Sequence, residues 1–144
     1  MRSLFSPGFG LAFLLLVILR ATAQPDAAQP NAVDRYRELQ TWRAAPALTA
    51  AQKSETAQLL RNAEPMIRLA AAEVLLAHAP LPAEAIAPLA AAVVNDDDST
   101  VRGTAAAALA AAALTTAGPD AFGPIQQILL GPDLRARQTM ATAL

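Results

Sequence analysis

The chain has 144 residues, about the length of one ordinary domain, of which 54% are hydrophobic and 16% are charged, with a net charge of −1. This mild acidity argues against a nucleic-acid-binding protein, because such proteins need a basic stripe to displace counterions. The chain has no cysteine, which excludes disulfides, thiolate metal sites and c-type haem attachment.

Residues 1–23 are predicted to be a secretory signal peptide. A basic start, Met1-Arg2, precedes an apolar run at residues 9–19, and residues 21–23 (ATA) have the small-x-small pattern of a cleavage site. The run is shorter than the roughly 20 apolar residues of a spanning helix, so we expect no stable membrane span after cleavage. A buried hydrophobic helix is the alternative. We therefore expect cleavage after Ala23 and export to a periplasm or the extracellular space, which suits a protein without disulfides.

Residues 24–31, with two prolines and two glutamines, are predicted to be a flexible leader. A first helix is expected over residues 32–43, because its larger apolar side chains recur at helical spacing. These side chains are Val33, Tyr36, Leu39 and Trp42.

A second helix, to about residue 62, is expected to open with a capping box between Thr49 and Gln52, in which each side chain accepts a backbone N–H of the other residue. Residues 32–63 lack the alanine-rich phrase described next, so we interpret them as an N-terminal helical cap of a repeat array. A separate helical hairpin is the alternative.

An alanine-rich phrase recurs along the rest of the chain. Residues 96–109 form an acidic loop followed by Val-Arg and an alanine-rich segment, and residues 64–75 repeat this order with Ile-Arg. Residues 131–137 form a weaker copy with Leu-Arg. The pairs are spaced by 34 and 33 residues, a period typical of helical repeats. They are Ile67-Arg68, Val101-Arg102 and Leu134-Arg135.

The helices between these phrases also recur. Residues 85–89 (AIAPL) match residues 121–125 (AFGPI) at an offset of 36 residues, and both are followed by an apolar pair. Because both halves of the unit recur, we predict repeats over residues 64–96 and 97–130 and a partial repeat over residues 131–144. The partial copy is either a terminal cap or the start of further repeats beyond Leu144.

These phrases resemble HEAT repeats, most closely the short HEAT-like variety shared by many bacterial scaffold proteins and by phycobilisome lyases. The resemblance covers residues 64–130 well and residues 131–144 in part. It implies an all-α fold, an α-solenoid in which antiparallel helix pairs stack with a right-handed turn and the second helices line a concave binding face. It also implies a structural role for the arginines of the phrase and for one acid of the loop. These residues are Arg68, Arg102 and Arg135, with Asp97 or Asp98 as the acid.

No catalytic, metal or cofactor site is expected. The three consecutive aspartates at residues 96–98 do not have the spaced acids and turn glycine of a calcium loop, and capping of a helix by Asp98 or Ser99 is the interpretation we favour. His78 is the one histidine, and the chain offers no cysteine beside it to bind a metal. Phosphate loops, nucleophile elbows and metalloprotease motifs do not occur in the sequence.

The sequence therefore favours an exported, non-enzymatic scaffold that binds another protein. Tyr36 and Trp42 are candidate contacts, because both residue types are frequent at interface hot spots. Packing of this pair against Leu59 and Leu60 is the alternative. Gln126 and Gln127 are the candidate contacts of the second helices. Two further hypotheses remain: an N-terminal part of a longer exported protein whose activity lies beyond residue 144, and a lyase-like or chaperone-like binder of a small ligand.

Overall fold

The computed structural model describes residues 31–115 and 118–144, so the predicted signal peptide and residues 24–30 of the predicted leader lie outside the described residues. The described part of the chain is entirely helical, which confirms the predicted all-α class. The helices are α2 (Ala32–Ala44), α3 (Ala50–Leu59), α4 (Pro65–Ala77), α5 (Ala83–Asn95), α6 (Ser99–Ala113), α7 (Gly118–Leu130) and α8 (Leu134–Ala143).

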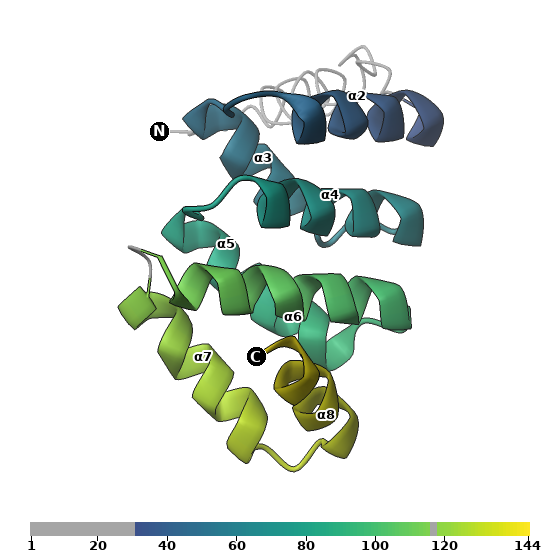
Figure 1. Cartoon of the computed structure of the whole chain (residues 1–144). Helices are drawn as coiled ribbons and strands as arrows, with labels where there is room; N and C mark the ends of the chain where they lie inside the picture. The colour runs from purple at the N-terminus through teal and green to yellow at the C-terminus, as the bar shows by residue number, and fades with distance from the viewer. Residues whose placement is uncertain (1–30, 116–117) are drawn as a thin grey trace, which may run out of the picture.

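The helices form two layers (Figure 1). In one layer α2 packs against α4 and α4 against α6, and the three helices run side by side. In the other layer α3 packs against α5 and α5 against α7. The layers are joined where α3 contacts α4 and where α5 contacts α6. Helix α8 packs against α6 and α7 at the end of the stack.

The helix starts follow from capping chemistry. The predicted capping box is present: the Thr49 hydroxyl accepts the backbone N–H of Gln52, and the Gln52 side chain accepts that of Thr49. Pro65 takes the first position of α4, where a backbone N–H would have no hydrogen-bond acceptor within the helix, so the missing N–H of proline costs nothing. The Asp98 carboxylate accepts the N–H groups of Thr100 and Val101, which confirms its predicted capping role.

Small side chains dominate the core. Alanines of α4, α5, α6 and α7 are buried together with a few larger residues such as Leu75, Leu89 and Leu109 in one cluster. An alanine side chain projects little, so it lets neighbouring helices pack closely, and the larger residues of the cluster are at most 1% exposed at Leu75, Leu89 and Leu109. A second cluster joins α2 to α4.

In the third phrase the repeat arginine lies two residues later than the sequence predicted. The N-caps of α4, α6 and α8 are Glu64, Asp98 and Asp133, and the third residue after each is buried. In α8 this buried residue is Ala136, whereas Leu134 is 58% exposed. The N-cap fixes which residues face the core, so Arg137, and not Arg135, takes the position that Arg68 and Arg102 hold.

Candidate functional site

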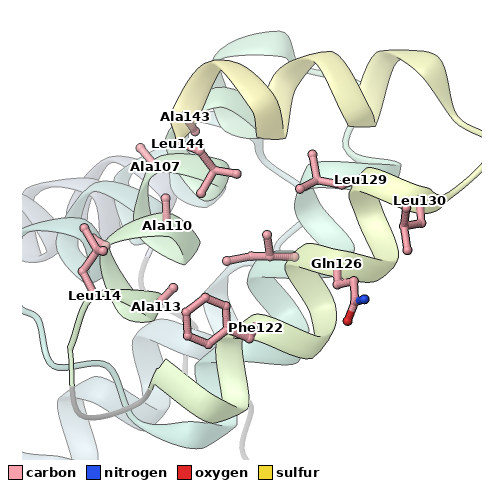
Figure 2. A pocket seen from close by; sticks show the side chains of 12 residues that line it. Ala107, Ala110, Ala113, Leu114, Phe122, Gln126, Leu129, Leu130, Ala143 and Leu144 are labelled. Carbon is pink, nitrogen blue, oxygen red and sulfur yellow. The ribbon is translucent and has the colours of Figure 1, made fainter.

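An apolar groove opens between α6, α7 and the end of α8 (Figure 2). Its volume is about 720 Å³, and none of its lining side chains is charged. We call it the C-terminal groove. It is lined by Ala107, Ala110, Ala111, Ala113 and Leu114 of α6 and the residue after it, by Phe122, Ile125, Gln126, Leu129 and Leu130 of α7, and by Ala143 and Leu144 at the end of the chain.

One side of helix α7 forms a wall of this groove, because its groove-lining side chains recur at helical spacing. Phe122, Gln126 and Leu129 recur at intervals of four and three residues, so they share one side of the helix. Figure 2 shows the Phe122 ring lying beside Ala113 of α6, and Leu129 facing Leu144 across the gap. Phe122 is 60% exposed and Leu130 is 76% exposed. Exposed large apolar side chains gathered around one hollow are typical of an interaction site.

The preceding unit shows how the same wall is covered elsewhere in the chain. Ile86 of α5 is the counterpart of Phe122 at the 36-residue offset, and it is only 4% exposed. Helix α5 packs against α6, and α7 packs against α8. The Phe122 end of α7 is not covered as Ile86 is, and this uncovered wall lines the C-terminal groove.

The predicted partner-binding residues lie in three different environments. Tyr36 is at the exposed surface of α2, but Trp42 is 8% exposed and packs with Leu39 and Ile67 in the cluster that joins α2 to α4. Trp42 is therefore a core residue that presents little surface to a partner. Gln126 lines the C-terminal groove, with its amide pointing outward in Figure 2.

Gln127 lies in a different hollow from its neighbour. This second hollow, of about 370 Å³, lies between α5, α7 and the start of α8. The structure thus separates the two glutamines and places Tyr36 on α2, at the other end of the stack (Figure 1).

Sequence reasoning missed Phe122, Leu130 and Leu144 as surface residues. Phe122 and Leu130 occupy positions that are apolar in both copies of the second helix, and such positions indicate a core face. The exposed fraction of Phe122 depends on which helices cover it in the fold, and the pattern of apolar residues does not determine this. A possible signal was the replacement of Ile86 by the bulkier Phe122 in the second copy.

An ion pair of Arg68 links α4 to the loop before α6. The Nε and Nη2 atoms of Arg68 donate to the two carboxylate oxygens of Asp96 at 2.7 and 2.9 Å, and the side chains are 15% and 4% exposed. The hydrogen bonds from Arg68 lower the pKa of Asp96, and the same bonds raise the pKa of Arg68. The acid that pairs with the repeat arginine is therefore Asp96, whereas Asp98 caps α6 and Asp97 is exposed.

Within residues 31–115 and 118–144, no group of three or more His, Cys, Asp or Glu residues is arranged to hold a metal ion. His78 lies at the end of α4, where its Nε2 atom is 2.9 Å from the carbonyl oxygen of Trp42. None of the helices in the described part of the chain is long and apolar enough to cross a membrane.

Comparison of the chain with protein-family models, curated proteins and solved structures finds no match. A functional assignment therefore rests on the arrangement of the helices and on the chemistry of their surface.

Proposed function

We propose that this protein is an exported, non-enzymatic helical-repeat scaffold, a HEAT-like α-solenoid, that binds a helix of another protein in the C-terminal groove. The observation that carries the proposal is the uncovered apolar wall around Phe122 and Leu130, which faces a hollow lined by uncharged side chains. Exclusion of water from such a wall is the main driving force for protein association.

The solenoid part of the proposal is supported by the periodic N-caps and by the contacts between helices. Glu64, Asp98 and Asp133 begin equivalent helices at intervals of 34 and 35 residues. Each equivalent helix contacts the next one along the chain, as do the helices of the second layer. Stacking of similar units in this way is the principle of repeat proteins, and extended binding surfaces are their usual use.

The choice of a helix as the bound element is supported by the preceding unit. There the wall formed by α5 is covered by α6, a helix that buries Val101, Ala105, Ala108 and Leu109. A bound helix that presents small apolar side chains along one face continues the packing of α8 on α7. A charged residue on that face would lose its water with no partner in the groove.

A second copy stacked head to tail fits the groove less well. The helices at the other end of the stack, α2 and α3, carry Arg35, Glu38 and Glu55, which form ion pairs with one another. Placing α2 and α3 against an uncharged wall would remove these charges from water without a new partner for them.

The absence of cysteine makes a labelling test direct, because one introduced thiol is unique in the chain. We would change Gln126→Cys at the groove, attach a polarity-sensitive dye, and titrate with a blocked peptide of residues 98–114, which carries the α6 sequence. The proposal predicts a saturable blue shift of the dye emission. A peptide with Leu109→Lys and a protein that also carries Phe122→Ser are the matched controls, and neither should give the shift.

The same labelled protein distinguishes the alternatives. Absence of a saturable shift with the α6 peptide would contradict the proposal. A blue shift that appears on concentrating the protein alone, together with a dimer in light scattering that Phe122→Ser dissociates, would assign the groove to a second copy instead.

A further inference from the structure

Arg68 and Arg102 hold the same place in successive units. Each is the fourth residue after the N-cap of its helix. The Nη1 atom of Arg68 donates to the carbonyl oxygens of Asn62 and Ala63, at 3.0 and 2.9 Å. The Nη1 atom of Arg102 makes the equivalent pair of bonds to two carbonyl oxygens of its own preceding loop, at 2.9 and 3.0 Å. The two guanidinium groups are therefore held in the same way on this side.

The two arginines differ at the other edge of the guanidinium group. The Nε and Nη2 atoms of Arg68 bind the Asp96 carboxylate. The Nε atom of Arg102 is buried and has no hydrogen-bond partner, in a residue that is only 9% exposed. A buried charged donor without an acceptor is unfavourable, because it has lost its water and gained nothing in exchange.

The missing partner has a cause in the sequence. Asp96 lies two residues before Asp98, the N-cap of α6, and the residue two positions before Asp133, the N-cap of α8, is Gly131. Glycine has no side chain that could reach the guanidinium group. Beside Gly131 lies the hollow of about 370 Å³ that Gln127, Asn95 and Pro132 also line. Arg102 does not line this hollow itself, but it is held by the carbonyl oxygen of Asp96, the residue after Asn95. The corresponding hollow of the preceding unit is lined by Arg68 and Asp96 themselves.

We propose that Arg102 is a carboxylate-binding site. A carboxylate from outside the described helices enters beside Gly131 and binds the Nε and Nη2 atoms of Arg102, as the Asp96 carboxylate binds the same atoms of Arg68. A carboxylate is the matching class of ligand, because its two oxygens pair with the Nε–Nη2 edge of a guanidinium group. An acidic side chain of a bound protein and a free carboxylic acid share this chemistry.

The neighbouring acid does not prevent this binding. The carboxylate of Asp133 accepts the N–H of Ala136 at 3.1 Å, as that of Asp98 accepts N–H groups in α6. At the preceding site the capping Asp98 coexists with the paired carboxylate of Asp96, and its backbone N–H donates to that carboxylate at 3.0 Å. A carboxylate beside Gly131 would thus meet surroundings that the chain already accommodates once.

Arginine Nε–H signals in proton–nitrogen correlation spectra test the proposal on the unmodified chain. We would titrate sodium acetate against sodium chloride at constant ionic strength and pH 7. The Nε–H signal of Arg102, identified by its disappearance in Arg102→Lys, should shift saturably with acetate. The signal of Arg68 is the internal control and should not move, because Asp96 occupies that edge. Equal shifts at the two arginines, or equal shifts with acetate and chloride, would overturn the proposal.

Two substitutions at Gly131 separate the carboxylate from the shape of the loop. A Cβ atom there would lie 3.0 Å from the carbonyl oxygen of Gln127, so Gly131→Asp and Gly131→Ala disturb the backbone alike. Gly131→Asp supplies the missing carboxylate and should abolish the acetate response, whereas Gly131→Ala should keep it. The opposite pattern would contradict the proposal, and if neither variant folds the titration of the unmodified chain decides.

The source of the carboxylate is distinguished by a second ligand, N-acetyl-aspartate N-methylamide, which presents an Asp side chain on a peptide backbone. A shift of the Arg102 signal with both ligands assigns the site to an acidic side chain of a protein. A shift with acetate alone assigns it to a small free acid. The outcome does not depend on the C-terminal groove, so it can succeed or fail separately from the proposed function.

Discussion

The ion pair between Arg68 and Asp96 is expected to stabilise the stack strongly, and Asp96→Asn tests this. The substitution keeps the shape of the side chain and removes its charge. Both partners are mostly buried and joined by two hydrogen bonds, and loss of the carboxylate charge leaves the buried Arg68 guanidinium with only its bonds to the carbonyl oxygens of Asn62 and Ala63. From the usual contribution of hydrogen bonds to charged groups and the usual cost of breaking a buried ion pair, we expect Asp96→Asn to lower the free energy of unfolding by about 2–3 kcal/mol. For a chain of this size, the loss corresponds to a decrease in Tm of about 10 °C.

The assay is thermal unfolding followed by helical circular dichroism, with Asp97→Asn as the matched control. Asp97 is exposed and adjacent in the sequence, and it contributes its backbone carbonyl to Arg102, which the substitution leaves in place. We expect Asp97→Asn to change the free energy of unfolding by less than about 0.5 kcal/mol. Equal Tm values for the two variants would refute the reasoning, because charge near the loop would then matter and the paired geometry would not.

The same comparison has a pH dependence whose sign follows from the pKa of Asp96. The hydrogen bonds from Arg68 lower this pKa in the folded state, whereas the unfolded chain has the ordinary value of about 3.9. A lowered carboxyl pKa contributes stability that is present above the unfolded value and is lost as the pH falls through the folded value. The Tm difference between the unmodified protein and Asp96→Asn should therefore be full at pH 7 and should shrink below about pH 4. A difference that does not change between pH 7 and pH 2.5 would contradict this assignment.

Three further predictions concern the surface, the core and the mature chain. Phe122→Ser should reduce the fluorescence of a hydrophobic dye bound to the protein, and it should change Tm by less than about 3 °C because the ring is mostly exposed. Val33→Ser on α2 is the control and should leave the dye signal unchanged. A loss of dye signal with both variants would argue against dye binding in the groove. Trp42, the one tryptophan, should emit at short wavelength in the folded protein and shift to the red on unfolding, since it is 8% exposed; emission at the wavelength of a solvated indole in the folded protein would contradict its burial. After export from a bacterial cell, N-terminal sequencing should begin at Gln24, and an uncut Met1 would refute the predicted cleavage.

The helices were largely predictable from the sequence because their starts have local chemical causes. Thr49 with Gln52, Pro65 and Asp98 each begin a helix where capping rules predict one. The repeat arginine of the third phrase was misplaced by two residues because Leu134-Arg135 resembles the apolar-Arg pairs of the other phrases. The Asp133 cap sets the actual register.

The surface of the fold was less predictable because exposure depends on neighbouring elements. Phe122 and Ile86 occupy matching positions of similar helices, yet Phe122 is 60% exposed and Ile86 is 4% exposed. Likewise, the sequence predicted Asp97 or Asp98 as the structural acid of this loop, whereas the partner of Arg68 is Asp96. Only the path of the loop determines that Asp96 turns inward while Asp97 faces solvent.

The most direct test of the central claim is an amide shift map of the isotope-labelled protein with the blocked α6 peptide of residues 98–114. We predict that the largest shifts fall on the groove wall at Phe122, Gln126 and Leu130 and at the end of α8, while Tyr36 and the rest of α2 do not change. Shifts centred on α2, or on Gln127 and the α5 side of the stack, would show that the C-terminal groove does not bind the helix and would contradict the account.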